Sequence, residues 1–107
     1  MDKTLITPEV VDRQYQFSRM KGTTWSLYST FRNAKEAMKL KECLPRIDRP
    51  TLLIWGEDDL LFPPSVGEGL QRAIPGSELQ IVEKSGHIPM WETPEKVNPL
   101  IVAFLSG

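Results

Sequence analysis

Apolar and polar positions follow a helical period in the first part of the chain. Thr7 can cap a helix, Pro8 suits its first turn, and Glu9 favours the positive end of the helix dipole. Gly22 is expected to end this helix near Lys21. The pattern therefore predicts one capped helix before the first glycine.

A second helix is predicted from about Thr24 to Lys41, because apolar side chains recur there at the three-and-four spacing of one helix face. The opposite face is charged. We expect the apolar face to pack in a core, since helical spacing alone predicts its aromatic side chains. An apolar acyl pocket lined by Trp25, Tyr28 and Phe31 is the alternative. The face consists of Leu27, Tyr28, Phe31, Ala34 and Met38.

The period changes after a break near Pro45 to Pro50. Residues 51–55 form a short, continuous apolar run that stops at Gly56, which is typical of a strand buried on both faces in a parallel sheet. Further along, the pattern predicts a helix over about 65–73, a strand over 78–83, a loop that holds Gly86 and His87, and a helix over about 94–105 with Thr93 as its cap.

This order of elements predicts an α/β fold in which two parallel strands are joined by one right-handed crossover and flanked by helices. Two strands are too few for an independent sheet, because backbone groups at the edges and apolar faces would stay exposed to water. The chain is therefore expected to be part of a larger sheet. The proline break separates a helical segment, 1–44, from an α/β segment, 45–107.

Composition and charge narrow the class of protein. The 107 residues fit one domain, and 40% hydrophobic with 25% charged residues is close to the globular average. Thirteen basic and fourteen acidic side chains leave a formal charge of -1, without a cationic stripe for nucleic acid. No apolar run approaches the roughly 20 residues that span a bilayer, and no secretory signal is recognisable. A cytoplasmic protein without a membrane segment is the expectation.

No metal or cofactor is expected. One cysteine and one histidine give no recognisable zinc-ligand set, and a single cysteine cannot form an internal disulfide. We interpret Cys43 as a small apolar residue at a helix end rather than a catalytic thiol, because no basic neighbour is implied that would make it a thiolate.

Polar clusters follow both predicted strands. Residues 56–59, with Asp58 and Asp59, come directly after the first strand, and residues 85–87, which end in His87, come shortly after the second. Reactive groups gather at the C-terminal ends of parallel strands. A carboxylate from the first cluster could orient the imidazole, so that its other nitrogen takes a proton from a nucleophile. The alternative is that the aspartates are turn residues and His87 is a polar loop residue.

The stretches IDRPTLLIWGEDDLLFPP and IPGSELQIVEKSGHIPMWETPEKVNPLIVAFL resemble the C-terminal third of the α/β-hydrolase family, which includes esterases, lipases, epoxide hydrolases, haloperoxidases and carbon–carbon bond hydrolases. The resemblance covers roughly residues 44–106. It combines a Pro-Thr-Leu strand, a Gly-x-x-Asp-x-x-x-Pro turn, a Pro-Gly before the last strand, and a Ser-Gly-His loop. The predicted helices of residues 8–41 are similar to the end of the family's helical cap.

The resemblance implies roles for individual residues. By position, Asp59 matches the family's catalytic acid and His87 its catalytic base, with Asp58 as the second choice for the acid. Glu92 is implied to support the histidine loop by hydrogen bonds rather than to react. The supporting residues are therefore Gly56, Asp58, Gly86 and Glu92.

The family's nucleophile turn, written Gly-x-Ser-x-Gly or a near variant, is absent from the sequence. The resemblance therefore implies a C-terminal fragment or subunit of a serine-type hydrolase of esters or related bonds. The chain alone is predicted to be inactive, because covalent catalysis cannot begin without a nucleophile. Its expected partners are a small ester-like substrate and either a complementing N-terminal hydrolase half or further copies of the chain in a homo-oligomer.

Other interpretations stay open. A non-catalytic interaction module would keep the hydrolase segment as a scaffold and assemble through its open sheet edge. Asp59 and His87 could also activate water by themselves, for which general-base catalysis typically supplies about 10²–10⁴-fold. The substrate is not predicted, because one fold hosts many chemistries.

Overall fold

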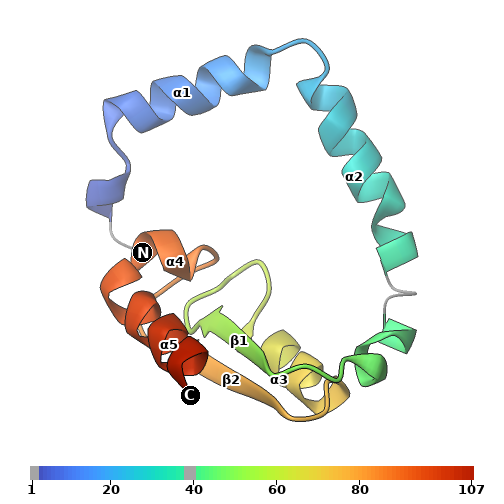
Figure 1. The fold of residues 1–107 in the computed structure, drawn as a ribbon. Helices are drawn as coiled ribbons and strands as arrows, with labels where there is room; N and C mark the ends of the chain where they lie inside the picture. The colour runs from blue at the N-terminus through green and yellow to red at the C-terminus, as the bar shows by residue number, and fades with distance from the viewer. Residues whose placement is uncertain (1–2, 38–40) are drawn as a thin grey trace. The chain divides into compact units, whose positions relative to one another are not determined.

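The computed structural model describes residues 3–37 and 41–107 (Figure 1). The chain forms two compact units, a helical unit (Asp2–Glu42) and an α/β unit (Cys43–Gly107). Their division falls close to the break that proline placement indicates. The interpretation of the first unit as a cap remains a prediction.

The helical unit contains a short 3-10 turn, η1 (Lys3–Leu5), followed by α1 (Pro8–Arg19) and α2 (Thr23–Ala37). Thr7 caps α1 as predicted, because its hydroxyl oxygen accepts the N–H of Val10 at 3.3 Å. The pattern therefore identified the start of this helix correctly.

The helix ends differ from the expectation. α1 ends at Arg19 rather than near Lys21. Gly22 has a φ of +95° and lies in the turn between α1 and α2, a conformation that glycine adopts without steric cost. The predicted end of the second helix near Lys41 follows residues 38–40, which lie outside the described residues.

The apolar face of α2 is not buried. Leu27 and Tyr28 are each 55% exposed and Phe31 is 76% exposed, so the expectation of core packing is wrong for these side chains. A helix buries an apolar face only against another element, and a unit of two main helices has too few elements to enclose one. The side chains of Ala34 and Met38 lie outside those that the structure describes.

The α/β unit has the predicted arrangement. Its strands β1 (Thr51–Gly56) and β2 (Ser77–Val82) pair in parallel, with Thr51 beside Ser77 and Gly56 beside Val82. The prediction of two parallel strands with flanking helices is confirmed. The other elements are η3 (Leu44–Arg46), α3 (Pro64–Ala73), α4 (Pro89–Glu92) and α5 (Pro94–Ser106). The sequence predicted a loop where α4 lies, because four residues are too few to show a period.

Helix α3 covers one face of the sheet. Successive side chains of a strand point to opposite faces, so Trp55 of β1 and Leu79 of β2 share a face in this register. A Cβ added at Gly67 of α3 would come within 3.0 Å of the Trp55 ring and 3.2 Å of Leu79. The glycine therefore lets α3 lie close against the strands.

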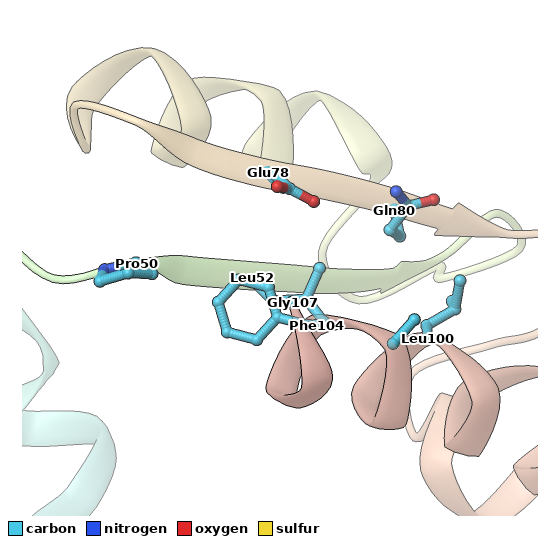
Figure 2. Close-up of a pocket in the computed structure, with 8 residues that line it drawn as sticks. Pro50, Leu52, Glu78, Gln80, Leu100, Phe104 and Gly107 are labelled. Atoms are coloured by element: carbon cyan, nitrogen blue, oxygen red, sulfur yellow. The ribbon is translucent and has the colours of Figure 1, made fainter.

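Helix α5 covers the opposite face, and a cavity of about 510 Å³ lies between this helix and the strands. Figure 2 shows the side chains that line it. Leu52 of β1 and Gln80 of β2 line this cavity together with Leu100 and Phe104 of α5. Its lining also includes Pro50, which precedes β1. This cavity therefore extends to the end of the sheet at which the strands begin.

Few apolar side chains of the α/β unit are fully buried. Ile74, Val82 and Val97 are each 5% exposed or less, whereas Val102 and Leu105 of α5 are 63% and 78% exposed. Two strands and their helices enclose a small core, because small assemblies bury a small fraction of their surface. Such exposure is expected of one part of a larger sheet, which remains a prediction for this chain.

Candidate active site

Asp59 lies in the loop that follows β1, and backbone groups hold its carboxylate in place. The Oδ1 atom accepts the N–H groups of Leu61 and Phe62, each at 2.9 Å. A short aspartate side chain makes such a turn because it reaches N–H groups two and three residues further on. Asp59 is only 6% exposed. Its other carboxylate oxygen, Oδ2, is left for a different partner.

His87 lies in the loop between β2 and α4, and Glu92 of α4 holds both sides of that loop. The Gly86 N–H donates to Glu92 Oε2 and the Ile88 N–H donates to Glu92 Oε1, each at 3.0 Å. Both bonds are strengthened by the charge of the carboxylate. A Cβ at Gly86 would come within 2.9 Å of Glu92 Oε2. One carboxylate thus fixes the peptide groups on either side of the imidazole.

The two loops lie directly against each other at the ends of the strands. The Asp58 N–H donates to the Ser85 carbonyl at 2.8 Å, which continues the pairing beyond the last residues of the sheet. Gly56 permits this approach, because a Cβ there would overlap the carbonyl oxygens of Gly86 and Ser85. A residue with any side chain at position 56 would therefore push the loops apart.

This approach brings Asp59 and His87 together, with 2.9 Å between Oδ2 and Nδ1. An ionised carboxylate only accepts hydrogen bonds, so Nδ1 carries the proton and Nε2 is the nitrogen that can accept one. The side chain of Asp59 is 4% exposed and that of His87 is 47% exposed. The Phe62 ring lies 5.6 Å from the imidazole ring. The pair consists of a buried acid and an accessible base.

The pKa of Asp59 is lowered from its ordinary value of 3.8. Burial raises this pKa, but the hydrogen bonds from His87, Phe62 and Leu61, together with the charge of His87, stabilise the carboxylate more strongly. Because the folded-state pKa lies below the unfolded-state value, the ionised group stabilises the fold above about pH 3.8. That stabilisation is lost as the pH falls through the folded-state pKa.

We expect the His87→Ala substitution to raise the pKa of Asp59, because it removes the hydrogen bond and the charge while the carboxyl stays largely buried. The stability that the ionised Asp59 contributes above about pH 3.8 should therefore be smaller in the variant, and less stability should be lost through this group as the pH falls. Titration of the Asp59 carboxyl ¹³C signal in the full chain measures the shift. Glu78→Gln, near the start of β2, is the control and should leave this pKa unchanged. An Asp59 pKa that is identical with and without His87 would contradict the geometry.

The side chain of Asp58 is exposed and does not contact His87 Nδ1, unlike that of Asp59. The Asp58 side chain lines a cavity beside His87, whereas its backbone N–H bonds to the Ser85 carbonyl. The Nδ1 atom of His87 is bonded to Asp59. Of the two candidates for the acid, the geometry therefore favours Asp59. The catalytic roles of all these residues stay predictions.

Thr93 is the N-cap residue of α5, as predicted, but its side chain makes no capping hydrogen bond. Its hydroxyl lies 3.0 Å from Ser85 Oγ and 3.2 Å from the Pro89 carbonyl oxygen. Ser85 is fully buried, and a buried hydroxyl needs a partner. Thr93 therefore ties the histidine loop to the start of α5.

Two cavities border His87, and both lie at the end of the sheet where the strands finish. The smaller has a volume of about 130 Å³ and includes Ile54 and Asp59 in its lining. The larger has a volume of about 560 Å³ and is mainly apolar. Besides His87, its lining includes Asp58, Glu92, Leu60, Leu61 and Ile88. No motif in the sequence had pointed to the three apolar residues of this set.

A sequence model that describes the α/β hydrolase fold matches residues 2–94. The chain belongs to the α/β-hydrolase fold family. The resemblance that the strand-end motifs suggested is therefore confirmed, and the matched range extends well beyond those motifs into the helical unit.

Two relatives show which hydrolases this chain is similar to. It is 38% identical over 63 residues to a 2-hydroxy-6-oxononadienedioate/2-hydroxy-6-oxononatrienedioate hydrolase from Pseudomonas sp, an alignment that covers 59% of this chain and 22% of that protein. It is 36% identical over 86 residues to a pimeloyl-[acyl-carrier protein] methyl ester esterase from Neisseria meningitidis serogroup B, which covers 80% of this chain and 33% of that protein.

A solved α/β-hydrolase structure shows the same arrangement of elements. The meta-cleavage product hydrolase from Pseudomonas fluorescens IP01 superposes with a TM-score of 0.81 at 25% identity, covering 98% of this chain and 40% of that chain. The present chain thus spans between about a fifth and two fifths of the length of these hydrolases.

Within residues 3–37 and 41–107, no group of three or more His, Cys, Asp or Glu side chains is arranged to hold a metal ion. Among the helices of the same ranges, none combines the length and the apolar character needed to cross a bilayer.

Proposed function

We propose that this chain supplies the acid and the histidine of a catalytic triad in an α/β-hydrolase. The observation that supports the proposal is the hydrogen bond of 2.9 Å between the buried Asp59 carboxylate and Nδ1 of His87. Two backbone N–H groups fix the carboxylate, and Glu92 fixes the loop of the histidine. Such an arrangement keeps Nε2 available to take a proton.

In the proposed reaction, His87 Nε2 takes the proton of a serine hydroxyl while the serine oxygen attacks the carbonyl carbon of an ester. The same proton then passes to the departing alcohol, which leaves an acyl-enzyme. Water, activated by His87 in the same way, releases the acid and restores the serine. Asp59 stays ionised and stabilises the imidazolium in both steps. Glu92 is a positioning residue, because it acts only through the histidine loop.

The nucleophile comes from outside this sequence in our proposal. The sequence has no Gly-x-Ser-x-Gly turn, and the chain spans at most about two fifths of the hydrolases compared above. The missing hydroxyl and the central strands therefore belong to an N-terminal hydrolase half. That half is either an upstream segment of the same protein or a separate subunit.

A small molecule with an ester or a related bond is the proposed substrate. One relative is named as a methyl ester esterase and another as a hydrolase of 2-hydroxy-6-oxononadienedioate, so both names describe hydrolysis of a compound with a carbonyl group. The cavity of about 560 Å³ beside His87 has a size that is ordinary for small-molecule sites.

Joining the chain to its complementary half tests this function. The chain is produced together with the polypeptide encoded directly upstream of its first codon. We expect the complex to hydrolyse 4-nitrophenyl butyrate and to be labelled by a serine-directed phosphonate, whereas this chain alone should do neither. A complex with a half that carries a nucleophile turn, but that neither hydrolyses the ester nor is labelled, would contradict the proposal.

A second candidate is a non-catalytic interaction module. The observation that favours it is the two-stranded sheet of the described residues, together with exposed Val102 and Leu105 on α5. Such a module would dimerise in a concentration-dependent way, as measured by sedimentation, and its complexes would not react with the phosphonate. A monomer that gains labelling with the upstream half would exclude it.

A further inference from the structure

The cavity of about 560 Å³ beside His87 carries negative charge. Its lining includes the acidic residues Asp58 and Glu92, and no lysine or arginine lines it in the described part of the chain. Asp59 places a third carboxylate directly behind the imidazole. A ligand that brings its own carboxylate into this cavity would meet like charges.

Apolar side chains make up most of the remaining surface of the cavity. Leu60 is 99% exposed, Leu61 is 64% exposed and Ile88 is 41% exposed. Methyl and methylene groups of a ligand would be removed from water against these side chains. The cavity is therefore suited to an apolar, uncharged group next to the reactive imidazole.

Asp58 and Glu92 differ in whether their carboxylates accept hydrogen bonds from the protein. Both carboxylate oxygens of Glu92 accept backbone N–H groups, from Gly86 and Ile88. The carboxylate of Asp58 makes no hydrogen bond to any of the described residues, and its side chain is exposed. Its charge therefore acts on whatever enters the cavity.

We propose that this cavity binds the uncharged acyl group of the substrate and that Asp58 makes the site discriminate against acyl groups that carry a carboxylate. The inference rests on the proposed function, because it names the substrate class of the same site. The relative from Pseudomonas sp is named for a dioate substrate, so this preference would distinguish the present chain from it.

The expected discrimination is modest, because Asp58 is exposed and water screens its charge. At low ionic strength we expect an uncharged ester to bind about two- to fivefold more tightly than an anionic ester of similar length. At high salt the difference should vanish, since the screening length becomes shorter than the cavity.

The test is a pair of NMR titrations of the full 107-residue chain, one with methyl butyrate and one with the monomethyl succinate anion. Methyl butyrate should shift the methyl signals of Leu60, Leu61 and Ile88 and bind more tightly than the anion. Asp58→Asn should remove the difference in affinity. Asp48→Asn, the same substitution before the start of β1, is the matched control and should keep it.

Three results would overturn the inference: equal affinities in the wild type, a difference that survives in Asp58→Asn, or methyl butyrate that leaves these three methyl signals unmoved. Binding does not require the nucleophile. A complex that fails to hydrolyse esters while the affinity difference persists would therefore contradict the proposed function alone. Hydrolysis without any affinity difference would contradict only the inference.

Discussion

The Asp59→Asn substitution is expected to lower kcat/KM for 4-nitrophenyl butyrate by about 10⁴-fold in the complex with the N-terminal half. Asparagine keeps the shape of the side chain but has no charge to stabilise an imidazolium. Its amide can also donate to Nδ1 of His87, which favours the tautomer that cannot take a proton at Nε2. The loss should therefore fall on kcat, with KM little changed, as steady-state kinetics at neutral pH would show.

Asp58→Asn is the matched control for this prediction, because it makes the same substitution one residue away, where the carboxylate does not bond to His87. We expect it to cost less than about tenfold on an uncharged ester. His87→Ala should cost at least as much as Asp59→Asn, because the two residues act as one unit. A larger loss of kcat/KM in Asp58→Asn than in Asp59→Asn would identify Asp58 as the catalytic acid. Full activity in His87→Ala would refute the triad.

The meeting of the two loops was predictable because it depends on strand order alone. A continuous apolar run that stops at Gly56 indicates a buried parallel strand, and the ends of neighbouring parallel strands meet at one edge of a sheet. The acidic cluster and the histidine cluster each follow such a strand end. Asp59 and His87 could therefore be placed near each other without knowledge of any contact between them.

The contacts that fix the pair were not predictable in the same way. Leu61 and Phe62 hold the carboxylate through backbone N–H groups, which nearly every residue type provides. The position of Thr93 predicted a helix cap. Its hydroxyl instead forms a hydrogen bond with the buried Ser85 hydroxyl, on the other side of α4 in the sequence. A local pattern does not show which distant polar group will need a partner.

Burial was the least predictable property of the helical unit. The spacing of Leu27, Tyr28 and Phe31 identified the helix α2 correctly, because spacing reflects the local backbone. It did not show what would cover that face, since the covering element need not be near in sequence. The exposure of these side chains depends on which elements pack against the helix, and the sequence of the helix alone does not contain that information.

Gly56→Ala is expected to destabilise the α/β unit by about 3 kcal/mol, at the upper end of what an added methyl group costs in a packed site. The added Cβ would overlap the carbonyl oxygens of Gly86 and Ser85, which are backbone atoms and cannot move aside as a flexible side chain can. To relieve the overlap the loops must separate, which also lengthens the Asp59–His87 hydrogen bond. Urea unfolding of the full chain, followed by tryptophan fluorescence, measures the loss.

Gly69→Ala in α3 is the matched control, because the atom nearest to its added Cβ is the Arg72 guanidinium at 4.0 Å. Alanine favours a helix over glycine by up to about 1 kcal/mol, so this variant should be as stable as the wild type or more stable. The two substitutions add the same methyl group, which overlaps backbone carbonyl oxygens at position 56 but has no close contact at position 69. Equal urea midpoints for the two variants would mean that the loops need not touch at Gly56, and the close Asp59–His87 contact would then lose its structural cause.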